Sequence, residues 1–309
     1  MERKPTYESP LGSRYASREM LYLFSPDNKF TTWRKLWVAL AEAEKELGLP
    51  ITDAQIKELK AHVSDIDYAA ARAYEERVRH DVMAHVHAYA DQCGEGTGAL
   101  LHLGATSCYV TDNTDALILR DALKLIRGKL LEALRRLRAF ALEYRDLPTL
   151  GLTHLQPAQP VTVGKRACLW MQDLLMDVTD LDHALSTIRL LGSKGTTGTQ
   201  ASFMALFDGD GEKVLSLEKR IAEKMGLDAV YPVSGQTYPR KLDSRVLAVL
   251  SGIAQSAYKF AQDIRLLQAF HECEEPFGKE QIGSSAMAYK RNPMRSERIC
   301  ALSRHVMAL

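Results

Sequence analysis

The chain has 309 residues, of which 46% are hydrophobic and 26% charged, so it is large enough to bury a substantial core. Forty basic residues face 39 acidic ones, and the net charge of +1 disfavours a dedicated nucleic-acid-binding protein, which carries a basic excess. No segment approaches the length of a transmembrane helix, so we expect no membrane partner. The five cysteines (Cys93, Cys108, Cys168, Cys273 and Cys300) are scattered without a CxxC pair. This pattern predicts reduced thiols in a cytoplasmic protein.

The N-terminal third is predicted to consist of short helices. Ser25 followed by Pro26 is typical of an N-cap and a first helical residue, and that helix should end near Gly48 and Pro50. Thr52 is a candidate cap for the next helix, and a third is predicted over residues 65–90. A glycine-rich stretch at 93–98 then interrupts the chain. We therefore predict a small helical domain over residues 1–110 and a second domain over 111–309.

Three long amphipathic helices are predicted in the second domain. Apolar residues recur every three or four positions over 113–144, 171–188 and 242–267. Helices of this length with one apolar stripe must pack against each other, whereas strand signals are few. The predicted fold class is all-α, with a long-helix bundle.

The segment from Pro293 to Leu309 begins another amphipathic helix, after which the sequence ends. An apolar face without following elements leads us to expect an incomplete bundle. The rest of its core would come from a C-terminal domain outside this chain or from a partner.

Polar, glycine-bearing loops join these elements and are candidate sites. In the loop at 102–108, Thr106 and Ser107 could cap the following helix or bind an anionic group. In the loop at 151–160, His154 is either a structural hydrogen-bonding residue or a general acid or base. The glycines and hydroxyls of residues 195–202 could offer backbone N–H groups to an anion, although the spacing is not that of a nucleotide-binding loop.

The most informative segment is 283–298, where two adjacent serines are followed by Lys290, Arg291, Arg295 and Arg298. By composition alone it could be a solvated basic loop before a helix. Loops that carry polar, reactive side chains and can move are also where function concentrates.

Residues 79–87 hold three histidines, His80, His85 and His87, and are a candidate metal site. Their spacing matches no zinc motif, and His85 points away from the face shared by the other two. We expect no metal there, and instead a polar patch of Arg79, His80 and Asp81.

Together, these loops resemble motifs of the fumarase/aspartase superfamily. The Ser284-Ser285-Ala286-Met287 stretch and the following Lys-Arg-Asn-Pro are similar to its signature. The Arg79-His-Asp, Thr153-His-Leu-Gln-Pro and Gly198-Thr-Gln-Ala-Ser motifs look like the animal-type adenylosuccinate lyase branch of that superfamily. The resemblance covers the chain from about Ser9 onward. It implies an all-α homotetramer that eliminates fumarate from a succinylated nucleotide, without a metal or other cofactor.

Residue roles are carried over motif by motif. The resemblance implies that Ser284 is the general base and His154 the general acid, with Lys290 near the carboxylates of the substrate. The residues it implies for substrate binding are Arg14, Tyr15, Arg79, His80, Asp81, Thr106, Ser107, Gln236, Asn292 and Arg298. It also implies that each site is assembled from several subunits.

Two departures and two alternatives accompany this interpretation. Ala288 stands where the superfamily signature has proline, and this should alter loop closure without removing a reactive group. Superfamily members also extend well beyond residue 309. The alternatives are another fumarate-releasing lyase, such as argininosuccinate lyase, and an inactive chain that acts only as an oligomer subunit. The Arg79-His80-Asp81 motif and the basic end of the signature favour a nucleotide substrate.

Overall fold

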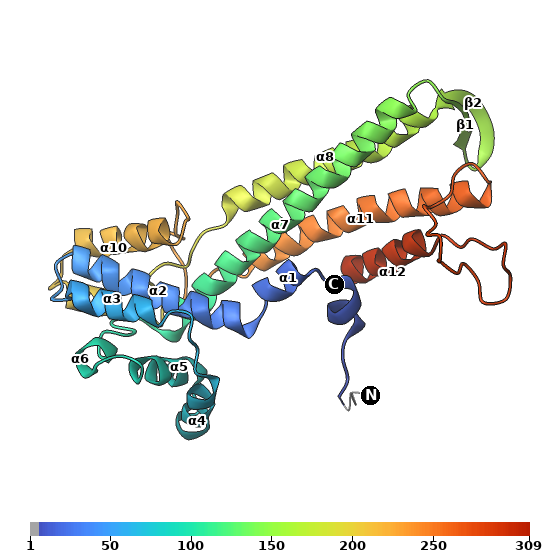
Figure 1. Ribbon diagram of the computed structural model, residues 1–309. Helices are drawn as coiled ribbons and strands as arrows, with labels where there is room; N and C mark the ends of the chain where they lie inside the picture. The colour runs from blue at the N-terminus through green and yellow to red at the C-terminus, as the bar shows by residue number, and fades with distance from the viewer. Residues whose placement is uncertain (1–5) are drawn as a thin grey trace. The chain divides into compact units, whose positions relative to one another are not determined.

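The structure is a computed structural model that describes residues 6–309, and these are mainly helical (Figure 1). The predicted all-α fold class is confirmed. The chain forms two compact units, one of residues up to Ala122 with Ile188–Arg240, the other of Leu123–Thr187 with Lys241–Leu309. The boundary near residue 110 stays a prediction. Residues 6–309 contain no helix long and apolar enough to cross a membrane.

The first unit is built around a core of aromatic side chains. Its elements are η1 (Leu11–Tyr15), α1 (Arg18–Leu23), α2 (Pro26–Glu46), α3 (Asp53–Ala61), α4 (Tyr68–Val78), α5 (Asp81–Ala90), α6 (Glu95–Gly98), the first part of α7 (Ser107–Glu143), α9 (Ala201–Leu206) and α10 (Gly211–Lys224). Trp33, Trp37, Tyr89, Tyr109 and Phe203 are almost completely buried in it. Burial of such large side chains supplies much of the apolar area that stabilises the unit.

Helix boundaries in this unit follow from local capping. The Ser25 hydroxyl accepts from the backbone N–H of Asn28 and Pro26 is the first helical residue, as predicted. Thr52 forms a reciprocal capping box with Gln55. The prediction of one helix over 65–90 is wrong, because Arg79 takes a left-handed conformation (φ +56°) that ends α4.

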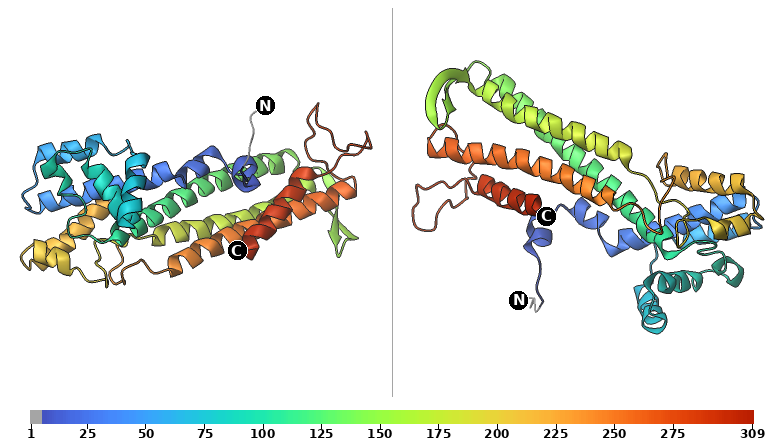
Figure 2. Two further views of the ribbon diagram at one scale, coloured as in Figure 1. Left: turned by 90° about the horizontal axis from the view of Figure 1, so that it is seen from below. Right: turned by 180° about the vertical axis from the view of Figure 1, so that it is seen from behind.

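The second unit consists mainly of long helices. Its elements are the remainder of α7, β1 (Pro148–Thr153), β2 (Gln156–Thr162), α8 (Val163–Thr187), α11 (Lys241–Ala269) and α12 (Met294–Ala308). The three predicted long helices and the C-terminal one are confirmed. Helices α8 and α12 both pack against α11, as the two views of Figure 2 show. Trp170 of α8 meets Phe260 of α11 edge-on, with ring centroids 5.0 Å apart.

A β-hairpin follows α7 and was not predicted. Strands β1 and β2 are antiparallel, and Thr153 pairs with Gln156, so His154 and Leu155 form a two-residue turn. Both turn residues have positive φ (+52° and +59°), a conformation that Asn-Gly usually supplies. Since Pro157 and Pro160 also argue against a strand, the sequence pattern did not indicate this hairpin.

Glu44 of α2 is buried in the core of the first unit, and its burial should make the stability of the protein depend on pH. The residue is completely buried, neither carboxylate oxygen has a hydrogen-bond partner among the described residues, and burial raises its pKa from 4.5 to about 8. The native state therefore keeps a proton that the unfolded chain releases. The free energy of unfolding should fall as pH rises from about 4.5 to about 8, and should not change with this group outside that window.

We expect Glu44→Gln to remove this contribution and to raise the free energy of unfolding at pH 8. Urea unfolding at several pH values measures it. Glu75→Gln, on an exposed position of α4, is the matched control. Parallel pH profiles for Glu44→Gln and the unaltered protein would contradict the prediction.

Candidate active site

In the first unit, the structure brings together predicted residues from α5 and α7. His80 is the N-cap of α5, and its Nδ1 accepts from the backbone N–H of Met83 at 3.4 Å. Its Nε2 lies 3.2 Å from the hydroxyl oxygen of Ser107, the first residue of α7, and its Nδ1 lies 3.5 Å from the Asp81 carboxylate. The predicted polar patch thus has Ser107 as a further member, and His80 is held between two helix N-termini.

The first turns of α7 also anchor two loops that carry candidate residues. The buried carboxylate of Asp112 accepts from the backbone N–H of Tyr238 at 3.0 Å and from the Arg240 guanidinium at 3.1 Å. The side chain of Asn113 both donates to and accepts from the backbone of Gly192, at 3.1 Å each. The α7 N-terminus is therefore a hub, which we define as Ser107, Asp112 and Asn113.

A buried ion pair secures the loop that begins at Gly192. Lys194 and Glu218 pair with only 4% and 6% of their side chains exposed, and Glu218 also accepts from the backbone N–H of Ser193 at 3.2 Å. Gln200 donates to the Ser193 hydroxyl at 3.1 Å. The loop at 195–200 is thus fixed at its entry and at its exit.

The remaining candidates of this unit lie on three other segments. Arg14 and Tyr15 are exposed at the end of η1, and Gln236 is exposed in the segment whose later residues bind Asp112. Thr106 immediately precedes the hub, and its buried hydroxyl has no hydrogen-bond partner among the described residues.

In the second unit, His154 is exposed at the turn of the β1–β2 hairpin. It borders a cavity of about 400 Å³ that Arg166 and Asp263 also line. The base of the hairpin is tied to the chain after α11, because Glu272 accepts from Arg166 at 2.9 Å and from Thr149 at 3.3 Å. A histidine at a left-handed position is strained, and strain of this kind is found at functional sites.

The signature loop, residues 276–292, surrounds a second cavity of about 700 Å³ that Ser284 and Lys290 both line. The Ser284 hydroxyl oxygen accepts from the backbone N–H groups of Ala286 (3.3 Å) and Met287 (3.2 Å). Asn292 donates to the Gly283 carbonyl at 2.8 Å. A side chain at position 283 would collide with the backbone of Lys290, so glycine is required there.

The hairpin and the signature loop lie at the same end of the second unit, where α11 ends (Figures 1 and 2). Ser284, Lys290 and His154 are therefore presented at one end of a helical scaffold. Arg298 is exposed on α12, which follows the loop.

Comparison with known proteins gives this arrangement a family. Residues 25–308 match the family described as "Lyase". The chain belongs to this lyase family. It is 57% identical to adenylosuccinate lyase of Saccharomyces cerevisiae over 98% of this chain and 63% of that protein, and 54% identical to that of Schizosaccharomyces pombe over 100% and 64%. It thus spans less than two thirds of the length of these relatives.

A solved structure shares the fold. The crystal structure of a fumarate lyase from Mesorhizobium sp. BNC1 superposes with a TM-score of 0.79 at 26% sequence identity, covering 98% of this chain and 66% of that one. Membership of the lyase family and an all-α scaffold are therefore established together.

In the described part of the chain, no three His, Cys, Asp or Glu side chains are grouped so that they could hold a metal ion. The three histidines near α5 separate: His80 caps the helix, His87 stacks on Tyr74 at 5.0 Å, and His85 stacks on Phe30 at 3.8 Å. Burial lowers the pKa of His85 to about 4, so its ring remains neutral.

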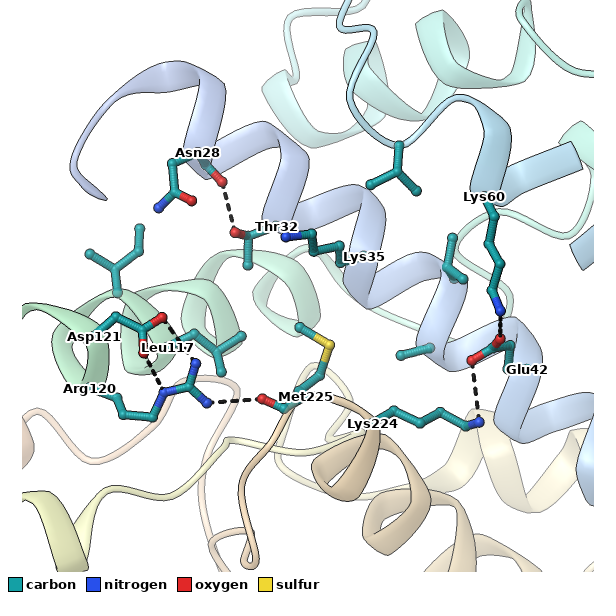
Figure 3. A pocket seen from close by; sticks show the side chains of 14 residues that line it. Asn28, Thr32, Lys35, Glu42, Lys60, Leu117, Arg120, Asp121, Lys224 and Met225 are labelled. Carbon is teal, nitrogen blue, oxygen red and sulfur yellow. Dashed lines mark hydrogen bonds and ion pairs between the residues drawn. The ribbon is translucent and has the colours of Figure 1, made fainter. Parts of the chain in front are cut away.

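Another cavity, of about 420 Å³, lies between α2, α3, α7 and α10 and is lined by none of the predicted site residues (Figure 3). Most of its charged residues are paired: Glu42 bridges Lys60 and Lys224, and Arg120 binds Asp121 at 2.8 Å and also donates to the Met225 carbonyl at 2.9 Å. We interpret these contacts as structural ones that hold the helices of the lyase-family fold together.

Sequence reasoning missed the residues that hold the site segments. Asp112, Asn113, Lys194 and Glu218 are buried and polar. Their signal is a polar pair, Asp112-Asn113, in a buried turn of an amphipathic helix, since such groups are buried only when they are hydrogen-bonded.

Proposed function

We propose that the chain acts as an adenylosuccinate lyase. The reaction removes fumarate from adenylosuccinate to give AMP, and from succinylaminoimidazole carboxamide ribotide in purine nucleotide biosynthesis. The observation that carries the proposal is the Ser284 hydroxyl, which accepts two backbone N–H groups in the Lys290 loop of a chain 57% identical to an adenylosuccinate lyase.

In this mechanism Ser284 is the general base. A serine hydroxyl is a poor base in water, because its alkoxide is costly to form. Two N–H donors on the same oxygen stabilise the alkoxide, in the way that an oxyanion hole stabilises developing charge. Lys290 would add positive charge near the substrate carboxylate, which becomes more negative as the neighbouring carbon loses its proton.

His154 is proposed as the general acid that protonates the departing nitrogen. Its exposed place on a two-residue turn suits an imidazole that must reach a bound substrate. The C–N bond breaks as the double bond of fumarate forms, and the electron pair of the broken bond takes the proton from His154. The two proton transfers complete the elimination, so we propose that it uses no metal and no organic cofactor.

Substrate binding is proposed for the remaining residues. The guanidinium groups of Arg14 and Arg298 suit a phosphate, because they offer paired donors. Asn292 is proposed to lie near the succinyl carboxylates. The other proposed contacts are Tyr15, Arg79, His80, Asp81, Thr106, Ser107 and Gln236, and the His80–Ser107 contact supports them.

We further propose a cytoplasmic homotetramer whose sites are shared between subunits. All five cysteines are free thiols, which suits a reducing compartment. Exposed apolar residues on α8, including Leu169, Leu175 and Met176, suit packing between helices of different subunits.

One assay tests the proposal. The purified protein is offered adenylosuccinate and, separately, argininosuccinate, while fumarate release is followed. We expect fumarate from adenylosuccinate alone. Release from argininosuccinate would favour the related lyase activity, and release from neither by a tetrameric protein would favour an inactive subunit; either result would overturn the proposal.

A further inference from the structure

The ends of the signature loop are joined by a cluster of hydrogen bonds from residues outside the proposed catalytic groups. Helix α12 begins at Met294 after Pro293, whose side chain cannot cap it. The carboxylate of Glu275, which precedes Arg295 by 20 residues in the sequence, caps the helix instead. Its Oε2 accepts from the backbone N–H of Arg295 at 3.1 Å and its Oε1 from that of Ser296 at 2.6 Å. A carboxylate at this position satisfies helix N–H groups and interacts favourably with the helix dipole.

Gln268, near the end of α11, completes the connection. Its Nε2 donates to the Arg291 carbonyl at 2.8 Å, and its Oε1 accepts from the backbone N–H of Glu275 at 3.3 Å. The chain that enters the loop and the chain that leaves it are thus bound to one side chain of a long helix. The Arg291 guanidinium also pairs with Glu274 at 2.9 Å.

These contacts hold the two ends of the loop, which we call its stem: Gln268, Glu275, Arg291, Arg295 and Ser296. The stem is distinct from the part of the loop that carries the candidate catalytic groups. Ser284 and Lys290 lie beyond the stem, on the segment that lines the cavity of about 700 Å³. Inside that segment, Asn292 holds the Gly283 carbonyl. With both ends held, movement of the loop is confined to the segment between them.

We propose that Glu275, supported by Gln268, is the positioning residue of the signature loop, because it fixes the start of the loop to the first turn of α12, where the loop ends. The proposal rests on the proposed function in so far as the loop is catalytic. It also means that Glu275 occupies the N–H groups of Arg295 and Ser296. These two N–H groups are therefore not available to bind a substrate anion.

The test uses Glu275→Gln, which can accept one of the two hydrogen bonds, and Glu275→Ala, which can accept neither. Glu280→Gln is the control, since it removes the same charge from an exposed position of the same loop. Tryptic cleavage at Lys279, Lys290 and Arg291 reports loop mobility, and amide exchange at Arg295 and Ser296 reports the cap. Cleavage within the loop and amide exchange at the cap should both be fastest in Glu275→Ala, slower in Glu275→Gln and slowest in the unaltered protein.

In the fumarate assay, we expect kcat to fall about tenfold in Glu275→Ala and by less in Glu275→Gln, because a loop that is no longer held places Ser284 and Lys290 less accurately. KM should change little, whereas general destabilisation would lower the amount of active protein and accelerate cleavage outside the loop. Unchanged cleavage, exchange and kcat in Glu275→Ala would overturn the proposal. If the unaltered protein released no fumarate, the proposed function would fail, yet the cleavage and exchange measurements would still decide the role of Glu275.

Discussion

Replacing Ser284 with alanine is expected to lower kcat for fumarate release from adenylosuccinate by roughly 10²- to 10⁴-fold, the usual contribution of a general base. The alanine retains the loop backbone but offers no oxygen to the N–H groups of Ala286 and Met287. Binding of the substrate should persist, because the proposed contacts to its phosphate and carboxylates come from other residues. Steady-state kinetics, with binding measured separately by calorimetry, check both expectations.

Ser285→Ala is the matched control for this variant. Ser285 is the next residue, it lines the same cavity, and its hydroxyl does not receive the two N–H groups. We expect its kcat to stay close to that of the unaltered protein. If Ser285→Ala lost as much activity as Ser284→Ala, or if Ser284→Ala stayed active, Ser284 would not be the base.

The helices could be predicted because their periodicity is a local property. Stripes of apolar residues such as those of α8 and α11 need only chain geometry to be recognised. Ser25 and Thr52 cap their helices through residues three positions away, so these caps were visible too. The break at Arg79 was not visible, because a non-glycine residue adopts the left-handed conformation there and only its surroundings stabilise it.

The site shows the same division. Candidate residues such as Ser284 and His154 could be proposed from motifs, whereas their local conformations could not. The contacts that hold the loops join residues far apart in the chain, such as Asp112 with Tyr238 and Glu275 with Ser296. Long-range pairings of this kind leave no periodic signal in a single sequence.

The largest effect on stability is expected at the buried ion pair between Lys194 and Glu218. Lys194→Met removes one partner and leaves the Glu218 carboxylate buried without its counter-charge, although it still accepts from the backbone N–H of Ser193. Breaking a buried pair in this way should lower the free energy of unfolding by roughly 3–5 kcal/mol. Urea unfolding at neutral pH measures the loss.

The double variant Lys194→Met/Glu218→Leu separates the cost of an unpaired charge from the value of the pair itself. Because both charges are gone, much of the stability lost in the single variant should return. Lys259→Met, which breaks the more exposed pair with Asp173, is the control and should cost about 1 kcal/mol or less. Equal losses in Lys194→Met and Lys259→Met would contradict a buried role for the pair. A double variant that regains stability but not kcat would show that Lys194 and Glu218 serve mainly to hold the loop at 195–200 in place.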